Sequence, residues 1–274
     1  MGVDRVLATY NSNPIPGGIR FDSATMNLAD VIESPESISH AVILLGITKP
    51  DTVAADRTLS EELNVSSVKR VIDQLAKWSI KPVYTSTESV FDGEKGNYVE
   101  TDQANPVLTY GRQKVQIEEY LQANHPESII ARLALVLGAD PKEGTQLTQW
   151  VEAIGRQETI NCAHDSFSSP VFIGDVSKAI ARLIDLNLSG IFHVSSRSSV
   201  SRLEMFQSLL AEMQRLRAVE ADVVSCSIND FDLQEKRPHN VSMNPDKLIG
   251  ATGIKIQSIE DICRKVLDSM RNVI

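Results

Sequence analysis

A tyrosine and a lysine stand four residues apart, at the predicted start of a helix. On a helix, Tyr110 and Lys114 share one face, so their side chains can lie next to each other. A phenol has a pKa of about 10 and exchanges protons poorly at neutral pH. A neighbouring ammonium favours the phenolate and lowers that pKa. The spacing therefore predicts that Lys114 lowers the pKa of Tyr110 and prepares it for acid-base catalysis.

Hydroxyl side chains end the segment that precedes this pair. Residues 81–87 read KPVYTST, which predicts a buried strand, and Ser86 or Thr87 at its carboxyl end can hold a substrate oxygen beside the phenol. Such an arrangement suits the reduction of a carbonyl by hydride from a nicotinamide. A tyrosine and a lysine at this spacing also occur by chance on exposed helices without a function. The position directly after a strand that continues as STESVFDG favours the catalytic interpretation.

Strands and helices alternate along the sequence, as a parallel sheet covered by helices on both faces requires. Residues 40–47 (HAVILLGI) are apolar on both faces, which predicts a central, buried strand. We therefore predict a Rossmann-like, doubly wound α/β fold, in which ligands bind where strands end, here after Leu45, Thr85 and Val136. The expected strands are residues 6–10, 19–22, 40–47, 81–87, 128–138 and 190–196. The expected helices are residues 28–34, 54–78, 110–124, 145–157, part of 167–186, 201–216 and 257–274.

The chain is expected to form two regions without a clear linker between them. Residues 1–138 are predicted to form a dinucleotide-binding domain, to which residues 171–195 return. Residues 139–274 are predicted to form mainly a smaller substrate-binding lobe and the C-terminal helices. Met205 and Met213 recur at helical spacing, so we expect them in the core rather than in contact with a cofactor.

The composition argues against several classes of function. A formal net charge of -9 and a pI of about 5.1 leave no basic face for nucleic acid. The longest apolar run, residues 41–47, is too short for a membrane span, and the first residues lack the pattern of a signal peptide. Five scattered histidines offer no metal-binding spacing, so we expect no metal site. The cysteines are dispersed and predict reduced thiols in a cytoplasmic protein: Cys162, Cys226 and Cys263.

Three motifs occur in the order found in a known enzyme family. STESVFDG, ETDQANP and YGRQK resemble successive motifs of the extended short-chain dehydrogenase/reductase family, in particular its dTDP-4-dehydrorhamnose reductase-like branch. HAVILLGITKPD, LNVSSVKRVIDQLAK, RLALVLG, SPVFIGDVSKAI, GIFHVSS and KRPHNVSMNPDKL resemble further landmarks of that branch. The resemblance implies that Tyr110 is the acid-base phenol. It also implies that Lys114 holds the nicotinamide ribose and that Thr87 binds the substrate carbonyl.

The same resemblance implies where a dinucleotide would bind. Asp22 would lie near the adenine, and Gly46 and Ile47 would pack on the dinucleotide. Asn11 and Ser12 replace the acidic residue that grips a ribose 2′-hydroxyl in the family. Because an uncharged site leaves room for a 2′-phosphate, NADP is favoured over NAD.

The implied activity is the NADP-dependent reduction, or alternatively the epimerisation, of a nucleotide-linked 4-keto sugar in carbohydrate biosynthesis. Asp165, Ser169 and Pro170 would lie near the substrate. Arg237 is a candidate for the nucleotide diphosphate, because a guanidinium fork suits phosphate oxygens, and a surface salt bridge is an equally weighted alternative for it. The resemblance also implies a homodimer.

The chain departs from the rhamnose enzymes around the site. Glu88 and Ser89 stand where that branch has Asp and Tyr, and Leu135 and Leu137 replace a segment that carries Trp and Tyr near the sugar. Leucine side chains make neither the hydrogen bonds nor the ring stacking of those residues. The resemblance therefore implies the reaction more directly than it implies the sugar.

The sequence also lacks the glycine-rich turn with which the family begins. Residues 6–14 resemble the family's second strand, so the first strand and helix are missing, and Gly17 and Gly18 are expected in an ordinary turn. Removing a central strand leaves unpaired edges or forces its neighbours to pair directly. We favour a fragment or a mis-started reading frame of a complete enzyme. A divergent member that binds no dinucleotide, or a strand supplied by another chain, would also account for the missing turn.

A second function remains open. The chain is alternatively a non-catalytic module that binds a dinucleotide or a sugar nucleotide, or a truncated inactive relative, since the same branch includes a regulatory subunit of methionine adenosyltransferase. The missing glycine turn favours this alternative. Thr87, Tyr110 and Lys114 favour the enzyme.

Overall fold

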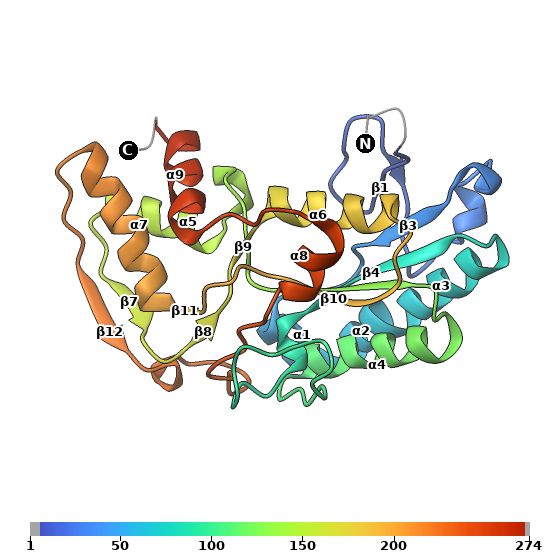
Figure 1. Cartoon of the computed structure of the whole chain (residues 1–274), viewed down its shortest axis with the longest axis horizontal. Helices are drawn as coiled ribbons and strands as arrows, with labels where there is room; N and C mark the ends of the chain where they lie inside the picture. Colours follow the sequence, from blue (N-terminus) through green and yellow to red (C-terminus); the bar gives the residue numbers. More distant parts are fainter. Residues whose placement is uncertain (1–5, 272–274) are drawn as a thin grey trace.

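A four-stranded parallel sheet forms the centre of the larger half of the molecule (Figure 1). The computed structural model describes residues 6–271. The strands lie in the order β10 (Gly190–Val194), β5 (Ile129–Leu133), β4 (Lys81–Thr87) and β3 (His40–Ile43). Because all of them run parallel, their carboxyl ends meet at one edge of the sheet. The predicted α/β fold with a parallel sheet is confirmed.

Helices cover both faces of this sheet (Figure 1). Successive residues of a strand point to opposite faces, so Tyr84 of β4 packs on the side of α3 (Ser67–Lys77) and α4 (Thr109–Asn124). The preceding residue, Val83, packs on the side of α6 (Ile173–Asp185), near α8 (Asp246–Thr252). Burial on both faces explains why these strands are almost uniformly apolar in sequence.

The predicted helix over residues 54–78 is broken into several segments. It consists of α1 (Pro50–Ala55), α2 (Arg57–Glu61), one π-helical turn (η4, Glu62–Ser66) and α3. The break after α1 is caused by Asp56, whose carboxylate accepts the backbone N–H of Leu59 at 2.9 Å and so begins a new helix. Helical periodicity alone does not reveal such an internal cap.

The strand over residues 40–47 is shorter than predicted, and it is not central among residues 6–271. There β3 pairs with β4 alone, while β1 (Thr9–Tyr10) and β2 (Ile19–Arg20) form a separate parallel pair. Val42 is 41% exposed and Leu44 is 72% exposed as a result. The expectation of a strand buried from both sides is therefore wrong for the described residues. Of the two predicted outcomes, the unpaired edge is the one observed.

A second core lies at the other end of the molecule (Figure 1). Helices α5 (Gln146–Gly155), α7 (Arg202–Leu216) and α9 (Ile259–Ser269) pack beside the parallel strands β7 (Ile160–Ala163) and β12 (Val223–Cys226). Met205 and Met213 of α7 are buried in this core, as predicted.

The predicted strand over residues 128–138 divides between the two halves. After β5 the chain leaves the main sheet, and β6 (Val136–Leu137) pairs with β9 (Val171–Phe172). A short antiparallel pair of β8 (Phe167–Ser168) and β11 (Val200–Ser201) follows. The remaining short elements are the 3₁₀ turns η2 (Leu28–Asp30), η3 (Pro35–Ser37), η5 (Glu88–Val90), η6 (Pro141–Glu143) and η7 (Ile228–Asp230).

Candidate active site

The start of α4 is held tightly against the end of β4, and this contact positions Tyr110. A Cβ atom at Gly111 would lie 2.1 Å from the carbonyl oxygen of Ser89, so only glycine permits the observed approach of α4 to η5. Glu235 accepts the backbone N–H of Thr109 at 3.0 Å and its hydroxyl at 2.7 Å. A carboxylate at this helix end also complements the helix dipole. Tyr110 is therefore fixed from two sides.

Tyr110 and Thr87 are brought together, as the sequence predicted. Both residues are 8% exposed, and the Thr87 side chain lies near enough to the Tyr110 hydroxyl to influence its ionisation. Burial raises the pKa of Tyr110 to about 12, the Thr87 side chain opposes this rise, and the charge of Glu88 adds to it. The net lowering of this pKa that the sequence predicted is not found in this structure, because desolvation of the phenolate dominates. The phenol is thus protonated at neutral pH.

Lys114 lies one turn further along α4 and is also buried. Its ammonium is 5.7 Å from the centre of the Tyr110 ring and donates to the carbonyl oxygen of Thr85 at 2.8 Å. It also lies 4.6 Å from the centre of the Tyr84 ring. Burial lowers the pKa of Lys114 to about 8, against the opposing charge of Glu118. An ammonium carries three N–H donors, so hydrogen bonds remain for a ribose hydroxyl.

Ser86 faces away from Thr87, because successive residues of a strand alternate between faces. Its hydroxyl donates to the buried carboxylate of Glu118. Glu118 also accepts from Arg132 of β5, from Nε at 3.1 Å and from Nη2 at 2.6 Å. The predicted role of Ser86 in substrate binding does not fit this geometry. Its hydroxyl instead joins β4, β5 and α4 behind the site.

Gly46 and Ile47 follow the end of β3 and are held by Asn64 of the π-helical turn. The Asn64 amide accepts the N–H of Ile47 at 2.6 Å and donates to its carbonyl at 3.0 Å and to Gln113 at 2.8 Å. Gly46 has a φ of +114°, and a Cβ there would lie 2.4 Å from Asn64. This region of backbone is essentially open only to glycine. The turn is therefore a rigid, partly exposed surface at the carboxyl edge of the sheet.

The other predicted cofactor residues follow β1 and β2. Asn11 and Ser12 are exposed, and Asp22 accepts the N–H of Ala24 at 3.0 Å. Their uncharged and acidic groups lie at strand ends, which fits a nucleoside, but the β1–β2 pair is not hydrogen-bonded to the main sheet. The residues around Tyr110 and Lys114 fit the nicotinamide end of a dinucleotide more directly.

A cavity of about 220 Å³, here called the Glu88 pocket, opens between the two halves of the chain. It is lined by Glu88, the residue after Thr87, whereas Thr87, Tyr110 and Lys114 themselves do not line it. Its walls are largely apolar, and its polar lining residues are Glu88, Ser89, Ser166, Ser168, Arg202 and Arg237. Ser168 donates to Glu88 at 2.6 Å. Burial raises the pKa of Glu88 to about 7, although Ser168 and the charge of Arg202 oppose the rise.

Three residues that line the Glu88 pocket were not predicted from the sequence: Glu88, Ser168 and Arg202. Glu88 and Ser168 are neighbours of predicted residues, and the position of Glu88 directly after Thr87 was a usable signal. Arg202 lies on α7, far along the chain, and no pattern in the sequence connects it with the site. The pocket also contains Arg237, whose guanidinium pairs with Asp51 at 2.8 Å, so both of its predicted roles are compatible with the structure.

Four predicted substrate residues do not line the Glu88 pocket: Ser86, Thr87, Asp165 and Ser169. Ser169 is 1% exposed and lies behind its wall, whereas its neighbours Ser168 and Pro170 face the cavity. Asp165 instead accepts the Ser227 hydroxyl at 2.6 Å and the N–H of Ile228 at 2.7 Å. Its carboxylate stabilises a turn of the second half.

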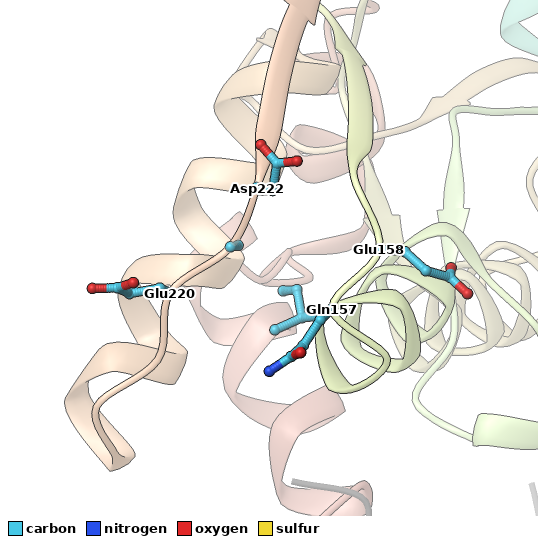
Figure 2. A pocket seen from close by; sticks show the side chains of 6 residues that line it. Gln157, Glu158, Glu220 and Asp222 are labelled. Atoms are coloured by element: carbon cyan, nitrogen blue, oxygen red, sulfur yellow. The ribbon is translucent and has the colours of Figure 1, made fainter.

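A separate hollow lies between the end of α5 and the strand β12 (Figure 2). Glu220, Asp222 and Glu158 come near it, but Glu158 points away from the other two and pairs with Arg156 at 2.7 Å (Figure 2). Within residues 6–271 no group of three or more His, Cys, Asp or Glu side chains is arranged to hold a metal ion. No helix in the same range combines the length and the apolarity needed to cross a membrane.

The fold and the site define a Rossmann-like α/β protein with a tyrosine and a lysine at the carboxyl edge of its sheet. The family model described as RmlD substrate binding domain matches residues 22–272, and the chain belongs to this family.

Similar proteins include named reductases. The chain is 29% identical over 184 residues to the probable low-salt glycan biosynthesis reductase Agl14 of Haloferax volcanii, an alignment that covers 65% of this chain and 60% of that protein. It is 22% identical to the dTDP-4-dehydrorhamnose reductase of Sinorhizobium fredii, over 82% of this chain and 78% of the relative. The chain thus spans less than two thirds of the haloarchaeal protein.

The chain also resembles a subunit of another enzyme and a solved reductase structure. Methionine adenosyltransferase 2 subunit beta of Danio rerio is 27% identical over 57% of this chain and 50% of its own length. The crystal structure of dTDP-4-dehydrorhamnose reductase from Bacillus anthracis in complex with NADP superposes with a TM-score of 0.76. It is 22% identical and covers 83% of this chain and 79% of that one. At this identity the superposition establishes the shared fold.

Proposed function

We propose that this protein is an NADP-dependent reductase of a nucleotide-linked 4-keto sugar. The observation that carries the proposal is the buried contact of Tyr110 with Thr87, one helical turn from the ammonium of Lys114. The Glu88 pocket, which is lined by the residue that follows Thr87, offers room and polar groups for a sugar. Family membership and the similarity to named reductases agree with this chemistry.

Thr87 and Tyr110 would orient the substrate carbonyl. The Thr87 hydroxyl and the phenol both donate to the carbonyl oxygen, and Tyr110 then transfers its proton to that oxygen as negative charge develops there. A phenol with a pKa of about 12 is protonated at neutral pH, which is the state that a reduction consumes. A bound reduced nicotinamide supplies the hydride in such a reaction.

Lys114 would serve the cofactor and the proton path. Its ammonium places positive charge below the phenol, which favours the phenolate left after proton transfer. Its remaining N–H donors are available for the nicotinamide ribose. From the resemblance of the chain to its family, we also propose that Gly46 and Ile47 pack on the dinucleotide. The adenosine end would lie near Asn11, Ser12 and Asp22. The uncharged Asn11 and Ser12 favour NADP over NAD.

We propose that the reaction takes place in the cytoplasm. Free cysteines fit such a reducing compartment, and the structure has Cys162, Cys226 and Cys263 as free thiols. Arg237 is proposed for the substrate diphosphate, since it lines the Glu88 pocket and its fork suits phosphate oxygens.

The test is a fluorescence titration with NADPH, followed by turnover of a dTDP-4-keto sugar. We expect NADPH to bind and to be oxidised when the sugar is added. Tyr110→Phe should keep NADPH binding and lose at least about 100-fold in turnover, as expected for removal of a general acid. Retention of full turnover in Tyr110→Phe would overturn the assignment.

The second candidate function is a non-catalytic binding module. It is favoured by the similarity to methionine adenosyltransferase 2 subunit beta. A stable protein that binds neither NADPH nor a sugar nucleotide would support this candidate against the reductase.

A further inference from the structure

Arg202 places a positive charge in a largely apolar cavity. It lies at the start of α7, is partly buried and faces the Glu88 pocket beside Leu135, Phe167 and Met205. Between residues 6 and 271 its guanidinium makes neither a hydrogen bond nor an ion pair within 4.0 Å. A guanidinium in such surroundings carries a desolvation cost that an anion would offset.

The neighbouring charges do not neutralise Arg202. Arg237 repels it, and that residue already has its own partner in Asp51. Glu88 is bonded to Ser168, and its pKa of about 7 leaves it only partly ionised at neutral pH. Burial, and then the charge of Arg237, lower the pKa of Arg202. The pocket therefore has excess positive charge in a chain whose net charge is -9.

We propose that Arg202 anchors an anionic group of the substrate, a phosphate or a carboxylate, in the Glu88 pocket. A guanidinium presents two parallel N–H donors that match two oxygens of either group. A neutral sugar hydroxyl would leave the charge uncompensated. The inference rests on the proposed function only in that the ligand is a sugar nucleotide.

Two parts of a sugar nucleotide carry this chemistry. One is the diphosphate, which Arg202 would then bind together with Arg237. The other is a carboxylate on the sugar itself, as in a uronic acid, which would lie close to Thr87 because Glu88 directly follows that residue. In both cases Arg202 binds an anionic group of the substrate.

Calorimetric titration with pyrophosphate, UDP-glucose and UDP-glucuronic acid separates these sources. If Arg202 binds the diphosphate, Arg202→Met should weaken the binding of all three ligands by at least about tenfold, as expected for loss of a charge-assisted hydrogen bond. If it reads a sugar carboxylate, only UDP-glucuronic acid should bind more weakly. The matched control is Arg197→Met, an exposed arginine whose loss should change none of the affinities.

Unchanged affinities in Arg202→Met, or no binding of any of the three ligands by the unmodified protein at millimolar concentration, would overturn the proposal. Arg202→Lys is the second variant, and it replaces Arg202→Met in the titrations if that variant does not fold. Because lysine keeps the charge and loses the two parallel N–H donors, Arg202→Lys should bind the anionic ligands more weakly than the unmodified protein without losing binding completely. NADPH oxidation is measured separately. A loss of anion binding in Arg202→Met supports the proposal even in a protein that does not oxidise NADPH.

Discussion

At the scale of single residues, burial governs the chemistry of the site. Tyr110 and Lys114 are shifted in the directions that remove charge from the interior, to pKa values of about 12 and about 8. At neutral pH the phenol of Tyr110 stays protonated, and Lys114 remains mostly an ammonium because its lowered pKa is still above 7. The proximity of the pair was predictable, but its desolvation was not, because spacing along a helix contains no information on what covers it.

The ionisation of Lys114 can be measured directly. With its pKa lowered from 10.5 to about 8, Lys114 loses its proton before the unfolded chain does, so its contribution to the free energy of unfolding increases between pH 8 and 10.5. In a ¹³C-lysine NMR titration we expect one signal to titrate near pH 8 and to be missing in Lys114→Arg. Turnover should fall as the pH rises past this value. If every lysine signal titrates above pH 10, the predicted shift is wrong.

At the scale of elements, close contacts fix α4 to the ends of two strands. Gly111 permits the contact with η5, and Glu118 connects β4 and β5 through Ser86 and Arg132. These contacts lie behind Tyr110 and Lys114 rather than in the pocket. They fix the positions of Tyr110 and Lys114 relative to the end of the sheet.

Gly111→Ala should displace the start of α4. The new Cβ would lie 2.1 Å from backbone, which cannot move freely, so we expect a loss of about 1–3 kcal/mol in unfolding free energy and reduced NADPH turnover. Gly155→Ala is the control, since a Cβ there meets nothing within 4 Å. Urea denaturation measures both variants. Equal stability of Gly111→Ala and the unmodified protein would contradict the close contact.

Glu118→Gln should leave Arg132 charged and unpaired in the interior. Removing one partner of a buried ion pair costs about 3–5 kcal/mol, and Glu118 and Arg132 have side chains that are 2% and 4% exposed. We expect Glu118→Gln with Arg132→Met to recover most of that loss, because no isolated charge remains. The exposed neighbour variant Glu119→Gln should be neutral. Urea denaturation compares the variants, and a double variant that is less stable than Glu118→Gln would show that an isolated Arg132 charge is not the cause of the loss.

At the scale of the whole molecule, the Glu88 pocket couples the two halves of the chain. Glu88 comes from the end of the sheet, Ser168 and Arg202 come from the second half, and Ser168 donates a hydrogen bond to Glu88. A pocket between two packed units is where a large, charged substrate can contact both of them. Substrate binding and the packing of the two halves should therefore both depend on the carboxyl group of Glu88.

Glu88 should make the protein less stable as the pH rises. Its pKa is about 7 in the folded chain and 4.5 in the absence of such surroundings, so the unfolded state ionises first and the free energy of unfolding falls across that range. The gap corresponds to about 3 kcal/mol. Denaturation at pH 5 and pH 8 isolates this contribution as the difference between the unmodified protein and Glu88→Gln, and the exposed control Glu94→Gln should behave like the unmodified protein. Glu88→Gln should lack this contribution, and an unchanged slope there would exclude Glu88 as the cause.

The sequence by itself determined the local features of this protein. Alternating apolar strands and amphipathic helices predicted the parallel sheet, and the order Thr87, Tyr110, Lys114 predicted which residues meet at its edge. Such features depend on neighbours in sequence, through helical and strand periodicity, so they are readable without coordinates.

Only the tertiary structure decided what surrounds those residues. The break of the long helix at Asp56, the exposed position of β3, the turn of Ser86 toward Glu118 and the meeting of Glu88 with Arg202 all depend on contacts between distant segments. The pKa values of Tyr110 and Lys114 depend on the same contacts, because desolvation is set by everything that packs around a group rather than by its place in the chain.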